Sequence, residues 1–157
     1  MKNNANLAEK ARAYAFLLLK YRLRSEREIA ERMGRKKFPA PVISGTIDFL
    51  KEKKFIDDRE FARAWVRSRW QKAIGPRRLR RELRVKGIDK DTIEQSLGDI
   101  AQGGCQREMI RDIVESRRAR MKGLDPRTAR RRLYAYLVRR GFSPEDILDS
   151  LPEMPTS

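Results

Sequence analysis

Four arginines between positions 77 and 84 have the clearest chemical role in this sequence. Because each helical residue advances about 100° around the axis, they fall within about 100° of one face of a helix: Arg77, Arg80, Arg81 and Arg84. Leu79 and Leu83 lie one turn apart on the opposite face. A guanidinium offers paired, planar N–H donors to a phosphate or a carboxylate. The face therefore predicts an acidic partner, without choosing between nucleic acid and protein.

A run of charges is usually a solvated face of mixed sign, but here only Glu82 interrupts the arginines. Like charges at this spacing repel by a few tenths of a kcal/mol per pair, about 0.2–0.5 kcal/mol. An acidic partner in use would offset that cost. We extend the candidate binding surface to further cations of this region and of a second arginine-rich helix: Arg67, Arg69, Lys72, Arg78, Lys86, Arg127 and Arg131.

Three aromatic or apolar side chains beside these cations have two interpretations each. Trp70 lies among arginines, where it is either an exposed stacking platform or packed on a neighbouring part of the chain, and we favour packing because large aromatics are mostly buried. Tyr134 and Val138 lie off the apolar face of their own helix, beside Arg127 and Arg131. They form either a seam that faces a partner or a contact within the chain.

The residues needed for catalysis are largely missing. The chain contains no histidine and one cysteine, so the commonest general base and any paired-cysteine metal site are unavailable. No Gly-x-x-x-x-Gly-Lys run occurs. Acidic residues stand mainly where helices are predicted to start, a position typical of capping: Asp57, Asp58, Asp89, Asp125, Glu145 and Asp146. We therefore predict a protein that is not an enzyme and holds no metal or cofactor.

Composition points to the same class of partner. Across 157 residues, 38 Lys and Arg oppose 22 Asp and Glu, for a formal charge of +16. No apolar run is long enough to span a membrane, so a polyanion is the expected partner, with nucleic acid first. Cys105 is the single cysteine and cannot form an intramolecular disulfide, which favours a reducing cytoplasm. We expect a cytoplasmic monomer.

Three helices must position the arginine face. Asp57 or Asp58 caps the first, Gly75-Pro76 ends it and begins the second, and Gly87 ends the second. Asp89 caps the third. The predicted core residues of these helices are Phe61, Ala64, Trp65, Ser68, Leu79, Leu83, Ile93 and Leu97.

The flanking segments are also predicted to be helical. A helix over residues 7–21 is expected to bury Tyr14, Leu17, Leu18 and Tyr21, and Ser25 with Glu28 predicts a capping box for the next helix. Core residues of the later helices are predicted to be Ile29, Met33, Ile43, Ile47, Leu50, Met109, Ile113, Arg117, Leu133, Leu137, Ile147 and Leu151. The glycines among residues 98–104 predict that this segment is the most flexible linker of the chain.

Similar closing turns recur along the chain. Phe38, Ile88 and Phe142 occupy equivalent places in these turns, at spacings of 50 and 54 residues. Recurrence of this kind is typical of small units that cover one another's apolar sides. The sequence thus predicts an all-α, elongated array of three tandem three-helix repeats, at 1–56, 57–103 and 104–157.

The middle stretch resembles the signature of the RecX family of recombination regulators. The elements that carry the resemblance are Phe55-Ile56, Asp57-Asp58, Phe61-Ala62, Ser68-Arg69, Gly75-Pro76, Arg78 to Leu83 and Lys86-Gly87-Ile88. Weaker echoes occur from Ser25 to Met33 and from Arg139 to Phe142. The resemblance implies a protein that binds in the groove of the RecA nucleoprotein filament and inhibits its ATPase and strand exchange.

The resemblance also implies a role in DNA recombination and repair, and weak, non-specific contact with single- and double-stranded DNA. Two other classes remain open. A helical DNA- or RNA-binding protein acting alone would have the same charge, and an enzyme acting on nucleic acid is disfavoured by the missing chemistry. Whether tight binding needs the recombinase separates the first two classes.

Overall fold

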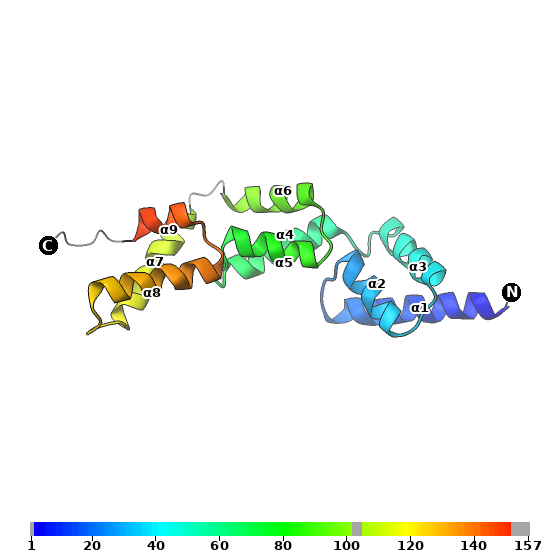
Figure 1. The fold of residues 1–157 in the computed structure, drawn as a ribbon. Helices are drawn as coiled ribbons and strands as arrows, with labels where there is room; N and C mark the ends of the chain where they lie inside the picture. The colour runs from blue at the N-terminus through cyan, green and yellow to red at the C-terminus, as the bar shows by residue number, and fades with distance from the viewer. Residues whose placement is uncertain (1, 102–104, 152–157) are drawn as a thin grey trace. The chain divides into compact units, whose positions relative to one another are not determined.

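The chain is all-helical. A computed structural model describes residues 2–101 and 105–151, and within these it contains nine helices and no strand (Figure 1). They are α1 (Lys2–Tyr21), α2 (Glu26–Arg35), α3 (Ala40–Glu52), α4 (Asp58–Trp70), α5 (Pro76–Val85), α6 (Lys90–Ala101), α7 (Cys105–Ala119), α8 (Pro126–Arg140) and α9 (Pro144–Ser150). By their contacts the described residues form two compact units, one within 2–64 and 83–93, the other within 65–82, 94–101 and 105–151.

In the first unit α1, α2 and α3 pack around one core (Figure 1). Its buried residues are Ala11, Ala15, Ile29, Met33, Leu50 and Ile56. The predicted burial of Leu17 and Tyr21 is wrong, because their side chains are 49% and 76% exposed. Ala11 and Ala15 take inward positions of α1, which lets its backbone approach α2 and α3 closely, while Phe16, Leu17 and Tyr21 are turned outward.

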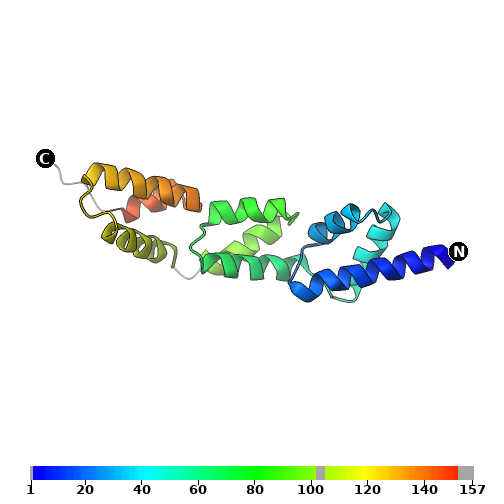
Figure 2. The ribbon, with the colours of Figure 1, turned by 90° about the horizontal axis from the view of Figure 1, so that it is seen from below.

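In the second unit α7, α8 and α9 pack around another core (Figure 2). Its buried residues are Ile110, Val114, Leu133, Leu137, Phe142, Ile147 and Leu151. Met109 and Ile113, predicted as the inward face of α7, are only partly buried, since the helix is turned by about one residue. Arg117 is not a core residue, and its guanidinium carbon lies 3.5 Å from the centre of the Tyr136 ring.

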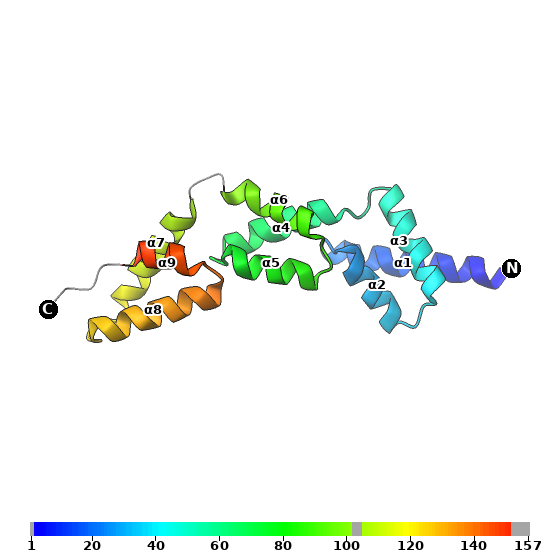
Figure 3. The ribbon, with the colours of Figure 1, turned by 45° about the horizontal axis from the view of Figure 1, so that its top comes forward.

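The middle helices start and stop close to the predicted signals (Figure 3). Asp57 Oδ1 accepts the backbone N–H of Arg59 at 2.7 Å, and Asp89 Oδ1 accepts that of Thr92 at 2.9 Å. Gly87 has a φ of +82° after α5, as a C-terminal glycine requires. The prediction of a linker over residues 98–104 is wrong in its first part, because α6 continues through Gly98 to residue 101. Residues 102–104 lie outside the described part of the chain.

The predicted leucines of the middle helices are buried, but the buried face of α4 differs from the predicted face. Leu79 and Leu83 are completely buried, and Ile93 and Leu97 are nearly so. On α4 the buried residues are Phe61, Ala62 and Val66, whereas Ala64 and Trp65 are half-buried and Ser68 is exposed. The predicted face of α4 was therefore displaced, because Ala62 and Val66 are smaller than Trp65 and fit a tighter helix contact.

Candidate partner-binding surface

Three arginines of α5 form an exposed row. Arg77, Arg81 and Arg84 are exposed at i, i+4 and i+7, opposite the buried Leu79 and Leu83. Neighbouring side chains at this spacing lie about 5–6 Å apart at Cβ. Within residues 2–101 and 105–151, no ion pair or side-chain hydrogen bond compensates any of the three. We call these three residues the arginine stripe.

Arg80 was predicted to belong to the same face, but it has a partner on α6. Its Nε and Nη2 donate to the two carboxylate oxygens of Glu94 at 2.7 and 2.9 Å. These hydrogen bonds raise the pKa of Arg80, and the opposite charge of Glu94 adds to the effect, against the opposing influence of burial. Arg80 therefore has its fork-shaped donor set already occupied, unlike the stripe.

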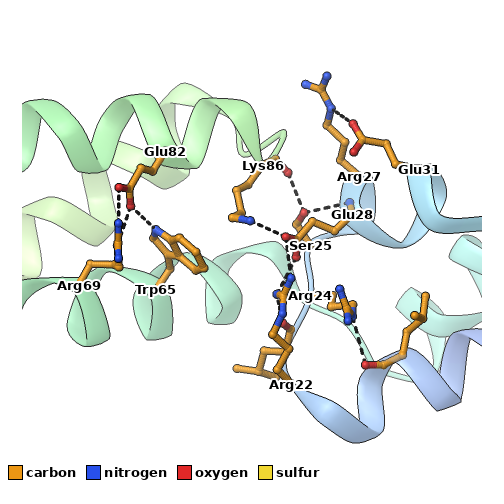
Figure 4. Close-up of polar contacts among 12 residues, drawn as sticks. Arg22, Arg24, Ser25, Arg27, Glu28, Glu31, Trp65, Arg69, Glu82 and Lys86 are labelled. Atoms are coloured by element: carbon orange, nitrogen blue, oxygen red, sulfur yellow. Dashed lines mark hydrogen bonds and ion pairs between the residues drawn. The ribbon is translucent and has the colours of Figure 1, made fainter.

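Glu82 binds two more of the predicted binding arginines, Arg69 and Arg78, and Figure 4 shows Arg69 beside it. Its carboxylate accepts from Arg69 Nε at 2.8 Å, from Arg78 Nε at 3.0 Å and from Trp65 Nε1 at 3.1 Å. Burial alone would raise the pKa of Glu82, but these hydrogen bonds outweigh it and lower the pKa. Arg69 and Trp65 thus tie α4 to α5, which carries the stripe, whereas Arg78 pairs with Glu82 within α5.

Lys86 is bonded within the first unit (Figure 4). Its Nζ donates to Glu28, which also accepts from Arg22 Nη1 at 2.9 Å. Burial would raise the pKa of Glu28, yet the hydrogen bonds from Arg22 and Lys86 lower it to about 2. The expected capping box is therefore only half formed, since Ser25 Oγ accepts the N–H of Glu28 at 3.2 Å while the Glu28 carboxylate binds these cations instead.

Two joints between helix ends position α5. In the first unit the buried Ser25 donates its hydroxyl to the carbonyl oxygen of Lys86 at 2.7 Å, so the end of α5 meets the start of α2. In the second unit Gly75 N donates to Arg140 O at 2.8 Å, and Arg77 N to Gly141 O at 2.9 Å. Each joint pairs polar groups that a helix end would otherwise leave unsatisfied. The backbone of Arg77 is thus anchored while its side chain stays exposed.

The other predicted binding residues are spread over several segments. Arg67 on α4, Lys72 after it, and Arg127 and Arg131 on α8 are all exposed. The carbonyl oxygen of Lys72 accepts from Arg140 Nη1 at 2.9 Å. No described contact joins these four cations to the stripe.

The aromatic alternatives are partly resolved. Trp70 is half-buried, so some of its ring remains accessible. Tyr134 packs partly against the core of the second unit, whereas Val138 is exposed. Tyr134 and Val138 therefore do not form one exposed seam that faces a partner.

A cleft of about 340 Å³ lies beside the start of α5. Its lining comprises Pro76, Arg77, Arg80, Glu94, Leu97, Gly98, Gln106, Ser143 and Asp146. Two arginines and two carboxylates balance there, so the cleft itself selects no charge. Among the described residues, no group of three or more Cys, Asp or Glu side chains is arranged to hold a metal ion, and no helix is both long and apolar enough to cross a membrane.

Comparison with known proteins identifies the family. Models of the RecX first, second and third three-helix domains match residues 11–50, 57–97 and 106–151 in order. A regulatory protein RecX from Mycobacterium sp. strain KMS is 38% identical over 150 residues, covering 92% of this chain and 81% of that protein. The chain belongs to the RecX family of regulatory proteins.

A second RecX protein and a solved RecX structure are also similar to this chain. The regulatory protein RecX of Bacillus pumilus is 36% identical over 136 residues, covering 86% of this chain and 51% of that protein. The crystal structure of RecX from Lactobacillus salivarius has the same fold, with a TM-score of 0.83, 24% identity, and coverage of 93% of this chain and 95% of that one. The predicted family and the three tandem three-helix repeats are confirmed, while the repeat boundaries at 56/57 and 103/104 remain predictions.

Proposed function

We propose that this RecX-family chain regulates homologous recombination and DNA repair by binding the RecA nucleoprotein filament and inhibiting its ATPase and strand exchange. The observation that carries the proposal is the arginine stripe, which lies in the segment matched by the RecX second three-helix domain. The stripe meets acidic side chains of the filament groove or the DNA backbone. The chain acts as a cytoplasmic monomer without a cofactor.

The division among the basic residues supports this placement of the contact. Arg69, Arg78 and Arg80 already have carboxylate partners within the chain, so a new acidic partner would have to displace those bonds. The stripe has no such competitor among the described residues. The three guanidinium groups project from neighbouring positions of one helix, so one acidic surface can meet all three, which favours the stripe over scattered surface cations.

A stand-alone nucleic-acid-binding protein is the second candidate, favoured by the formal charge of +16. Under our proposal, binding to DNA without recombinase is weak, independent of sequence and steeply salt-dependent, with a logarithmic slope of about 0.9 per neutralised duplex phosphate. Tight or sequence-selective binding to bare DNA that survives moderate salt would favour the second candidate.

The test replaces Arg77, Arg81 and Arg84 by Glu and measures RecA ATPase and strand exchange on single-stranded DNA during titration. The change alters the charge of an exposed face by six units and leaves the leucine face of α5 intact, so folding should survive; exposed substitutions typically cost under about 0.5 kcal/mol each. Repulsion replaces attraction at the contact, and we expect the concentration for half-inhibition to rise at least about tenfold.

A matched control separates position from total charge. Arg35, Arg111 and Arg118 are exposed on α2 and α7, and replacing all three by Glu changes the net charge equally. The control variant should inhibit much more strongly than the stripe variant at equal helicity. Equal inhibition by the wild-type and stripe proteins would exclude the stripe as the contact, and a wild-type protein that leaves both RecA activities unchanged would exclude the proposed function.

A further inference from the structure

Helix α1 has a second apolar face that its own core does not use. Ala11, Ala15 and Leu18 are the buried residues of the helix. Phe16, Leu17 and Tyr21 are 38%, 49% and 76% exposed. A helix that is apolar on two sides is normally covered on both. Together with Phe55, which is 50% exposed, these three residues form what we call the outer patch.

The outer patch is organised before any partner arrives. Phe55 follows α3, and its ring meets that of Phe16 edge to face, with centroids 4.9 Å apart and planes at 89°. The backbone N–H of Phe55 donates to Leu50 O at 2.8 Å, which holds the residue in place. Edge-to-face pairs are favourable contacts, and an aromatic anchor that is already fixed loses little entropy on binding.

Charge determines what can cover this patch. The segment from 10 to 24 contains five cations and no carboxylate: Lys10, Arg12, Lys20, Arg24 and Arg22, of which Arg22 is paired with Glu28. Lys20 lies on the same side of α1 as the patch, one turn from Phe16 and Leu17. A second copy of this chain would bring the same cations together, and like charges across an interface disfavour association. The occupant therefore presents apolar and acidic groups together.

The extent and make-up of the patch favour a protein as that occupant. Towards the start of α1 the exposed residues Asn6, Glu9 and Lys10 are polar, so the apolar face is short for a helix that lies on a membrane. Nucleobases bind by stacking on open ring faces. Leu17 has no ring, and part of the Phe16 and Phe55 surface is used in their mutual contact, which leaves Tyr21 as a single ring without a stacking partner beside it in the patch.

We propose that the outer patch is a second docking surface, covered by an acidic and partly apolar surface on the protein subunits of the recombinase filament. This inference rests on the proposed function and names a further contact for it. Two contacts on one chain raise the effective concentration of the second once the first has formed. The outer patch supplies apolar contact area that the arginine stripe lacks.

The experiment measures binding of a Leu17→Gln/Tyr21→Gln variant to three probes: RecA filaments on an oligo-dT strand, the bare strand, and anionic phospholipid vesicles. We expect at least about tenfold weaker binding to filaments, because aromatic anchors dominate such interfaces, with unchanged binding to bare oligo-dT. Tyr21→Phe keeps the ring and should bind filaments like the wild type. Leu23→Gln/Leu148→Gln is the matched control, since these leucines are 47% and 51% exposed outside the patch.

Each result bears on the inference. An equal loss of binding to bare oligo-dT would make nucleic acid the occupant, and a loss confined to vesicles would make it a membrane; either overturns the proposal, as does filament binding equal to that of the control. If the double variant loses helicity, Tyr21→Gln alone gives the answer, because that side chain is the most exposed of the patch. Wild-type protein that fails to bind filaments would overturn the proposed function as well. A Leu17→Gln/Tyr21→Gln variant that binds filaments like the wild type, while the stripe variant does not, would overturn only the outer patch.

Discussion

At the scale of single residues, whether an arginine is available to a partner depends on whether a carboxylate of the chain lies within reach of its guanidinium group. Arg69 and Arg78 share Glu82, and Arg80 takes Glu94. The exposed Arg80–Glu94 pair contributes only about 0–1 kcal/mol, but all three pairs decide which donors remain available to another molecule. The three stripe arginines remain available, and this is why the binding variant in our test leaves the paired arginines unchanged.

Glu28 provides a residue-scale prediction on pH. Its pKa in the folded protein is about 2, below the value of about 4.3 in an unfolded chain. Its contribution to stability is therefore complete above about pH 5 and is lost as the pH falls towards 2. Glu28→Gln should lower the urea midpoint at pH 7, by an amount equivalent to about 1–3 kcal/mol, and this difference from the wild type should shrink as the pH falls.

Glu31→Gln is the control for this prediction. Glu31 pairs with Arg27 at 2.9 Å, but both side chains are about half exposed, at 50% and 57%. Its removal should cost about 0.3–0.5 kcal/mol at pH 7. A wild-type–Glu28→Gln difference that stays constant between pH 7 and pH 2 would contradict the assigned role of Glu28.

At the scale of helices, the joints explain which turns need glycine. A Cβ on Gly75 would lie 2.5–2.6 Å from backbone atoms of Gly141 and Phe142, and a Cβ on Gly87 would lie 2.6–2.7 Å from carbon atoms of the Arg27 side chain. The end of one helix can approach the start of another this closely only without the side chain. Aligned helix ends also bring opposite ends of the helix dipoles together.

Gly141→Ala tests the joint between α8 and α5. Gly141 has a φ of +94°, and a Cβ there would overlap Cβ and the backbone nitrogen of Arg78. Gly123 is the matched control, with a φ of +91° and no atom within 4 Å of its would-be Cβ. Both substitutions incur backbone strain of about 1–2 kcal/mol, but only Gly141→Ala adds an overlap, worth about 1–3 kcal/mol.

Two measurements check this prediction. The urea midpoint should fall further for Gly141→Ala than for Gly123→Ala. Hydrogen exchange at the Arg77 amide, which donates to Gly141 O, should accelerate only in the Gly141 variant. Equal effects of the two substitutions would mean that the joint tolerates a side chain.

At the scale of the whole molecule, similar three-helix units recur with equivalent turns. The N-cap positions Ser25, Gly75 and Asp125 are 50 residues apart, and the terminal glycines Gly87 and Gly141 are 54 apart. The four extra residues lie between cap and glycine: α8 is five residues longer than α5, with 15 against 10, and Gly141 follows its helix one residue sooner than Gly87 does. Tandem units joined only to their neighbours typically form extended arrays.

The elongated array predicted from the sequence repeats can be tested by small-angle scattering. A compact globule of this length has a radius of gyration of about 15 Å. We expect a clearly larger value and an asymmetric distance distribution for the monomer at low concentration. A radius of gyration within about 1 Å of the compact value would contradict the elongated array.

Local sequence signals determined most of the secondary structure. Proline and glycine at the start and end of α5, the aspartates before α6 and α8, and the leucine pair Leu79 and Leu83 act through nearest neighbours, so they can be interpreted without the fold. The family resemblance and the three repeats follow from the same local patterns.

Only the tertiary structure decided which candidate site residues are available. Glu94 lies 14 positions from Arg80, Glu82 lies 13 from Arg69, and Glu28 lies 58 from Lys86, and spacings of this size contain no periodic signal. The same limit applies to α1, where helix period alone could not tell the alanine face from the Phe16 and Leu17 face. Both faces are apolar, and the choice depends on how closely the neighbouring helices pack, because small residues allow a shorter distance between helix axes.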